Sequence, residues 1–86
     1  MARPRNPRPK TITNSEKIRD NINVEVGKRI RMYRSGCRYT QEGLAEAVNI
    51  SVSTLKQIEN GFGIQIDNLY LLSLVLDVDI SDLLGL

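Results

Sequence analysis

The 86-residue sequence contains no histidine, no tryptophan and a single cysteine, Cys37. Without histidine, neither a serine–histidine–aspartate triad nor a zinc finger with histidine ligands can be built, and a single cysteine cannot form a disulfide within the chain. No apolar run approaches membrane-spanning length, and the N-terminus lacks the apolar stretch of a signal peptide. We therefore expect a cytoplasmic protein that is not an enzyme, keeps a reduced thiol, uses no cofactor or metal, and has no membrane partner and no evident small-molecule ligand.

Basic residues are missing from one end of the chain. The net charge of +2 says little, but no lysine or arginine follows Lys56, while the segment from Lys17 to Arg38 contains seven basic residues and two acidic ones. One end of the folded domain should therefore be positive and the other negative. Such a distribution can orient a protein on a polyanion.

Residues 1–15 are predicted to form a basic N-terminal arm ahead of a domain at residues 16–86. The first ten residues are punctuated by proline and have almost no apolar side chains, so they cannot bury enough surface to fold alone, and we expect disorder. Such an arm can lie along DNA, or it can be a solvated tail with no specific role; both interpretations are open. Its basic residues are Arg3, Arg5, Arg8 and Lys10.

The most informative segment is TQEGLAEAVNISVSTLKQIENG, from Thr40 to Gly61. Two groups of apolar residues recur in it at helical spacing, with a break at residues 49–51. Two apolar stripes so close together can be buried only if two short helices cross steeply and share one core. This arrangement predicts a helix-turn-helix, the unit that places its second helix in the DNA major groove. The apolar residues are Leu44, Ala45, Val48, Leu55 and Ile58.

Capping residues support these two helices. Thr40 and Ser51 are good N-caps, Asn49 tolerates the left-handed conformation that the turn requires, and Gly61 is a natural terminator. Around them, the periodicity predicts an all-α domain of five helices. We expect them at about residues 23–34, 41–48, 52–60, 67–76 (capped by Asp67) and 80–84 (capped by Asp79), the first extending upstream if Ile18 and Ile22 continue its spacing.

Residues 40–61 resemble the phage-repressor-like helix-turn-helix family, also called the XRE or Cro/CI family. Upstream, VGKRIRMYRSGCRYTQ is similar to the family's first helix and its exit loop; downstream, DNLYLLSLVLDVDISDLL is similar to its last two helices. The resemblance covers about residues 24–84. It implies a compact, five-helix, lambda-repressor-like DNA-binding domain that acts as a transcriptional regulator.

The sequence departs from the family at several positions. Gly43 stands where a good helix former is usual, so the first turn of the second helix should be weaker. Asn49 and Asp77 replace glycines that are common in the family, and residues 62–66 lack a frequent proline. The departures leave the fold in place and affect the second helix and the loop after the third.

The third helix is the candidate for reading bases. Because Leu55 and Ile58 face the core, the residues between and before them face outward, where serine, threonine and glutamine can hydrogen-bond to base edges and valine can touch a thymine methyl. The alternative is an ordinary polar surface, which the resemblance disfavours. The base-contacting candidates are Val52, Ser53, Thr54 and Gln57, with Gln57 the strongest.

Other positions are implied to contact phosphates. Gln41 opens the second helix, whose N-terminus suits an anion, and the resemblance implies a phosphate contact there. The phosphate-contacting candidates are Arg38, Tyr39, Gln41, Lys56 and Asn60. The resemblance also implies a structural ion pair between Arg34 and Glu59.

The expected partner is double-stranded DNA, bound by a homodimer because one short helix reads few base pairs. The alternative is a protein-interaction module, such as an antitoxin or an assembly scaffold, that uses the same fold. Its docking face could be the acidic surface from Asp67 to Asp82, ending in Leu83, Leu84 and Leu86. In the homodimer, by contrast, Leu83, Leu84 and Leu86 are expected to lie in the self-association surface. Of the tyrosines, Tyr33 and Tyr70 are expected to pack and Tyr39 to be exposed.

Overall fold

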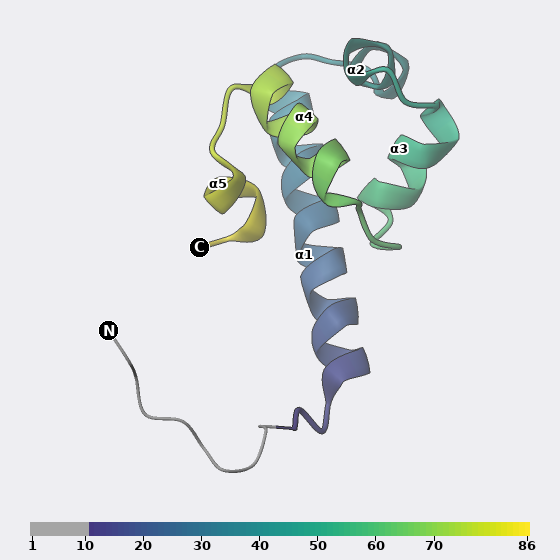
Figure 1. The fold of residues 1–86 in the computed structure, drawn as a ribbon. Coiled ribbons are helices and arrows are strands. Elements are labelled where there is room, and N and C mark those ends of the chain that lie inside the picture. The colour runs from purple at the N-terminus through teal and green to yellow at the C-terminus, as the bar shows by residue number, and fades with distance from the viewer. Residues whose placement is uncertain (1–10) are drawn as a thin grey trace.

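The computed structural model describes residues 11–86. In this part of the chain, the helical periodicity of the sequence corresponds to five α-helices, and there is no strand (Figure 1). All five predicted helices are present. They are α1 (Ser15–Gly36), α2 (Gln41–Val48), α3 (Val52–Glu59), α4 (Ile66–Leu76) and α5 (Ile80–Leu84).

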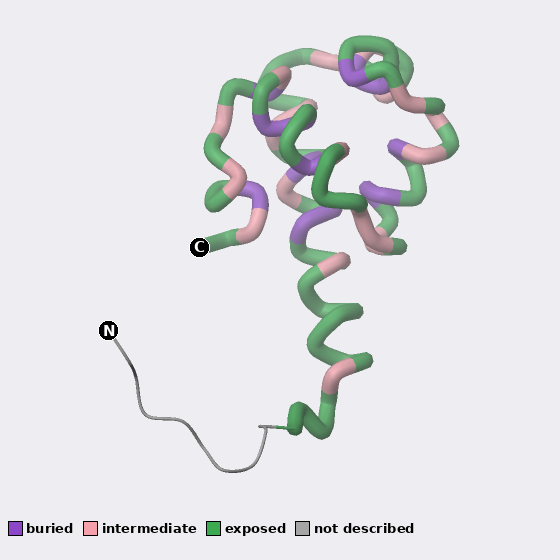
Figure 2. The backbone as a smooth tube through the Cα atoms, in the orientation of Figure 1, coloured by how far each residue is buried: buried purple, intermediate pink, exposed green. Residues whose placement is uncertain are grey.

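The largest difference from the sequence prediction lies in α1, which has 22 residues and begins at Ser15. The upstream extension suggested by Ile18 and Ile22 is therefore real, but both side chains are exposed. Figure 2 shows the first turns of α1 projecting from the body of the domain, while burial begins near Val26. Of the arm predicted at residues 1–15, residues 1–10 lie outside the described residues.

The core forms where the second half of α1 packs against α3 and α5, and where α2 packs against α3 and α4. Gly27 allows α1 to approach α3 closely: a Cβ atom there would lie 2.5 Å from the Ile58 carbonyl oxygen and 2.9 Å from that of Glu59. A side chain at this position would force α1 and α3 apart. The buried apolar residues are Val26, Ile30, Leu44, Ala45, Val48, Leu55, Ile58, Leu69, Leu72, Leu76 and Leu83.

The predicted caps of the two central helices are confirmed. Thr40 Oγ1 accepts a hydrogen bond from the Gly43 N–H at 2.9 Å, so α2 keeps its N-cap although Gly43 cannot complete a capping box. Ser51 Oγ accepts from the Thr54 N–H at 3.0 Å. Asn49 between the helices is left-handed, with φ of 60°. These local choices fix the sharp turn that sets α3 across α2.

The cap predicted for α4 is wrong. The helix begins at Ile66 with Gln65 as its N-cap, and Asp67 lies inside the first turn, where its Oδ1 accepts from the Asn68 N–H at 2.8 Å. The cap predicted for α5 is confirmed: Asp79 and Asp82 form a capping box.

Three predictions of side-chain exposure are also wrong. Tyr70 is 54% exposed on the outer face of α4. Tyr39, in contrast, packs partly buried against the core. Leu83 is completely buried, so it belongs to the core of the domain and cannot form part of a docking surface.

Candidate nucleic-acid interface

The outward face of α3 carries the polar residues that the sequence assigned to base reading. Leu55 and Ile58 are buried, whereas Ser53 and Gln57, one helical turn apart, are exposed. Val52 is half-buried and packs against the core. Ser53 and Gln57 therefore offer the most accessible polar groups of the four candidates.

Thr54 is partly committed to the structure of the turn. Its hydroxyl lies 2.8 Å from the Ser51 hydroxyl, and its backbone N–H donates to the same serine. The side chain is half-buried. Its capacity to reach a base edge is correspondingly lower than that of Gln57.

An open groove of about 590 Å³ runs beside α3. Thr54 and Gln57 border it on the helix side, and Phe62, Gln65 and Asn68 border it on the side of the loop and α4. Phe62 is among the most exposed apolar residues of the domain. The outward face of α3 is thus flanked by a concave surface with both polar and aromatic walls.

The phosphate-contacting candidates differ in the exposure of their side chains and in their hydrogen bonds within the domain. Arg38, Lys56 and Asn60 are exposed, and Arg38 has an unanticipated left-handed conformation with φ of 62°. Tyr39 is half-buried, and its carbonyl oxygen accepts a hydrogen bond from Arg34 Nη1 at 3.0 Å. Gln41 directs its side-chain Nε2 toward Glu59 Oε1, at 3.0 Å.

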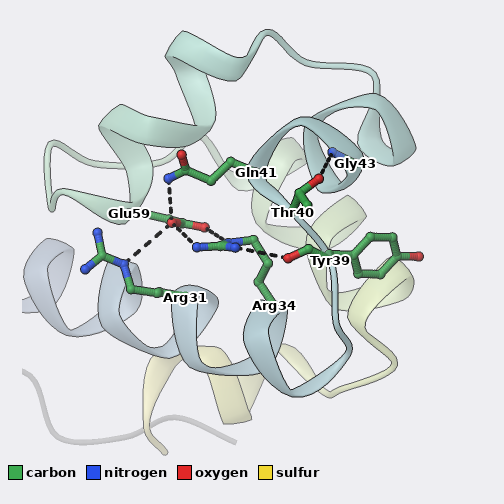
Figure 3. Close-up of polar contacts among 7 residues, drawn as sticks. All are labelled: Arg31, Arg34, Tyr39, Thr40, Gln41, Gly43 and Glu59. Carbon is green, nitrogen blue, oxygen red and sulfur yellow. Dashed lines mark hydrogen bonds and ion pairs between the residues drawn. The ribbon is translucent and has the colours of Figure 1, made fainter.

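Glu59 is the centre of a charge network that joins α1, α2 and α3 (Figure 3). Its side chain has no solvent exposure. Arg34 donates to it with two nitrogens, Nε at 2.7 Å and Nη2 at 3.1 Å, so the two residues that the resemblance paired are in contact. Arg31 Nε lies 3.6 Å from Glu59 Oε1.

Neither Arg31 nor Gln41 was predicted to contact Glu59. One signal was available for Arg31, because it precedes Arg34 by three residues and therefore lies near the same face of α1. No comparable signal existed for Gln41, whose contact depends on how α2 crosses α3. The result is one buried carboxylate with two guanidinium groups and one amide around it.

Basic residues are unevenly distributed among the helices. The basic residues from Lys17 to Arg38 lie on α1 and the loop after it, whereas α4 and α5 carry no basic residue. Within residues 11–86, no group of three or more His, Cys, Asp or Glu side chains is placed to hold a metal ion. In the same part of the chain, no helix combines the length and apolarity required to cross a membrane.

The sequence of this chain is similar to those of known proteins. A Helix-turn-helix family model matches residues 30–83. Over 35 residues, the chain is 57% identical to YazB of Bacillus subtilis (strain 168), described as an uncharacterized HTH-type transcriptional regulator; the match covers 41% of this chain and 51% of YazB. It therefore spans about half the length of that relative.

Two solved structures have a similar fold. SinR, a master regulator for biofilm formation solved in complex with DNA, is 36% identical, with a TM-score of 0.65 over 69% of this chain and 97% of that chain. The restriction-modification controller protein C.AhdI from Aeromonas hydrophila is 28% identical, with a TM-score of 0.67 over 70% of this chain and 92% of that chain. The all-α, repressor-type fold predicted from the sequence is confirmed.

Proposed function

The chain belongs to the helix-turn-helix family, and from this premise we propose that it is a sequence-specific, DNA-binding transcriptional regulator of the phage-repressor type. The observation that carries the proposal is the exposed polar face of α3, opposite buried Leu55 and Ile58. SinR, which has the same fold, was solved in complex with DNA. The protein acts by binding and not by catalysis, in the cytoplasm where its DNA target would lie.

In this proposal α3 enters the major groove and supplies specificity. Gln57 projects from the middle of the helix, and its amide can both donate to and accept from an adenine edge. Ser53 lies one turn earlier on the same face. Val52 and Thr54 flank them and complete the base-contacting set.

Phosphate contacts supply most of the affinity and its dependence on salt. Lys56 lies on α3 directly before Gln57, Asn60 is the C-cap of the same helix, and Arg38 projects from the loop before α2. Gln41 and Tyr39 complete the set at the start of α2, where the N–H groups of the first helical turn also face outward.

The basic arm is a further proposal. Deleting residues 1–10 removes four basic side chains, so binding to specific and random DNA should weaken together. Each lost phosphate contact lowers the slope of log K against log salt by about 0.9. Fluorescence anisotropy titrations at several salt concentrations measure this slope, and an unchanged slope would show that the arm does not contact DNA.

We further propose that the protein binds DNA as a homodimer, through the outer face of α4. Ile66, Tyr70 and Leu74 recur there at intervals of four residues, and all are exposed. Asp67 is the single charged residue of the helix, so little like-charge repulsion opposes the approach of a second copy. This face replaces the surface around Leu83, which is buried.

The same apolar face favours a second candidate function, a protein-interaction module such as an antitoxin or an assembly scaffold. Exposed contiguous apolar surface marks a contact with another macromolecule. A second copy and a different protein are distinguished by sedimentation of the purified chain. A dimer favours the regulator, whereas a monomer that fails to bind DNA favours the module.

A selection from random double-stranded DNA with the purified protein tests the main proposal. A DNA-binding regulator of this kind should enrich a short motif, with two related half-sites about one helical turn apart if it binds as a dimer. Enriched DNA should then bind at least a thousandfold more tightly than random DNA at physiological salt, about the lower limit for specific recognition. Failure to enrich any motif would overturn sequence-specific binding.

A further inference from the structure

The buried carboxylate of Glu59 has two positively charged groups around it, although one is enough to neutralise its charge. Arg34 alone neutralises it through two hydrogen bonds, in the bidentate geometry that gives the strongest arginine–carboxylate pairs. Arg31 brings a second guanidinium to the same group. The network therefore carries one positive charge in excess.

That excess charge lies at the surface. The Arg31 side chain is 56% exposed, whereas that of Arg34 is only 15% exposed. Arg31 approaches Glu59 through Nε, and Figure 3 shows its two terminal nitrogens directed away from the carboxylate. Those nitrogens retain the hydrogen-bond donors of the guanidinium fork, which match the geometry of a phosphate group.

Arg31 lies close to the first residue of α2. Gln41 Nε2 and Arg31 Nε both contact the same oxygen atom, Glu59 Oε1, so the two side chains cannot lie far apart. Gln41 is the first residue of α2, a position proposed above to face the DNA backbone. Arg31 belongs to α1 and was not among the residues that the sequence assigned to DNA.

We propose that Arg31 is an additional contact to a DNA phosphate, and that Glu59 is the positioning residue that holds Arg31 beside Gln41. The proposal rests on the proposed DNA-binding function and extends it to a residue outside the helix-turn-helix. The ligand is a backbone phosphodiester, whose oxygens accept from the terminal nitrogens of Arg31. This contact adds affinity for all sequences and no preference among bases.

Glu59 contributes by ordering Arg31 before DNA arrives. A free arginine loses much of its rotamer freedom when it is fixed against a phosphate. An arginine already held at Nε by a buried carboxylate loses less. The competing interpretation is an ordinary surface ion pair, which would leave DNA binding unaffected when it is removed.

Arg31→Gln is the first variant, with Arg29→Gln as its matched control. Both remove one positive charge from α1, but Arg29 lies against Gly85 at the α5 side of the domain. Fluorescence anisotropy is measured with the selected DNA and with random DNA, across a range of salt concentrations. Arg31→Gln should weaken binding to both DNAs about tenfold at low salt and lower the salt slope by about 0.9, whereas Arg29→Gln should leave the slope unchanged.

The role of Glu59 is tested by Glu59→Gln, alone and combined with Arg31→Gln. If Glu59 positions Arg31, the loss caused by Arg31→Gln should shrink severalfold in the Glu59→Gln background. Equal losses in both backgrounds would remove the positioning role. If Glu59→Gln does not fold, Arg31→Lys decides: it keeps the charge but lacks Nε, so it should recover less than half of the lost binding free energy, and full recovery would overturn positioning.

The outcomes also separate this inference from the proposed function. Wild-type protein that binds no DNA at any salt concentration overturns the function itself. Wild-type binding with an Arg31→Gln variant whose affinity and slope are unchanged overturns only the contact proposed for Arg31.

Discussion

Breaking the Arg34–Glu59 pair should cost a large part of the stability of the domain. Glu59→Ala removes the carboxylate that pairs with Arg34, whose side chain is 15% exposed and, within residues 11–86, would keep the Tyr39 carbonyl oxygen as its hydrogen-bond partner. Leaving one member of a buried ion pair without its partner costs roughly 3–5 kcal/mol. A domain of this size is stable by only about 4–13 kcal/mol in total, so the variant should lose from about a quarter to all of its stability.

The reverse change should be less harmful, for a reason that the structure supplies. In Arg34→Met, the carboxylate of Glu59 still has Gln41 at 3.0 Å and Arg31 at 3.6 Å. Arg31 is exposed enough to move closer and restore part of the charge balance. We therefore expect Arg34→Met to destabilise the domain by about 1–2 kcal/mol less than Glu59→Ala, a difference near the value of one hydrogen bond to a charged group.

Urea denaturation followed by far-ultraviolet circular dichroism measures these free energies, provided that unfolding is two-state. Each kcal/mol should also appear as a fall of about 4–8 °C in Tm. The double variant Arg34→Met, Glu59→Leu removes both charges and should be more stable than Glu59→Ala. Single variants that unfold within about 0.5 kcal/mol of the wild type would refute the reasoning, because substitutions without such a mechanism fall in that range.

Three further predictions concern the core, the readout and the dimer. Gly27→Ala should destabilise the domain by about 1–3 kcal/mol, because its Cβ would meet backbone carbonyls of α3. Gly36→Ala is the control in the same urea titration, because its Cβ would meet nothing within 4 Å. This control should be neutral or stabilising by up to about 1 kcal/mol. Gln57→Ala should lose about 1–3 kcal/mol of discrimination between cognate and random DNA, whereas Lys56→Ala should weaken binding to the two DNAs equally. Anisotropy titrations measure both affinities. An unchanged specificity ratio for Gln57→Ala would remove this residue from the base-reading set. Leu74→Glu, on the exposed face of α4, should shift sedimentation toward monomer while the chain still folds, and an unchanged dimer would place the interface elsewhere.

The sequence predicted best where structure is decided locally. Thr40, Asn49 and Ser51 act through hydrogen bonds and backbone conformations within a few residues, so the helix-turn-helix could be placed closely. The pairing of Arg34 with Glu59 crosses 25 residues and came from the resemblance alone. No local pattern could have produced it.

Prediction was weakest on α4 and α5, where most residues are apolar. When apolar residues surround a helix, periodicity cannot identify the face that is buried. Tyr70 was therefore assigned to packing and Leu83 to the surface, and the structure reverses both. In the candidate interface, the contact of Gln41 with Glu59 depends on the crossing of three helices, which spacing along the chain does not determine.

Because the first turns of α1 project from the domain, the two halves of this helix differ in how readily their hydrogen bonds open. From Ser15 to about Asn23 its hydrogen bonds are covered by little besides water, and so short a helical segment is marginal in isolation. Beyond Val26 the same helix can open only if the whole core opens. Amide hydrogen exchange should therefore be fast in the first turns and should slow by several orders of magnitude by Ile30. The two parts of α1 therefore differ in how fast their backbone hydrogen bonds open. They meet where Gly27 brings α1 against α3.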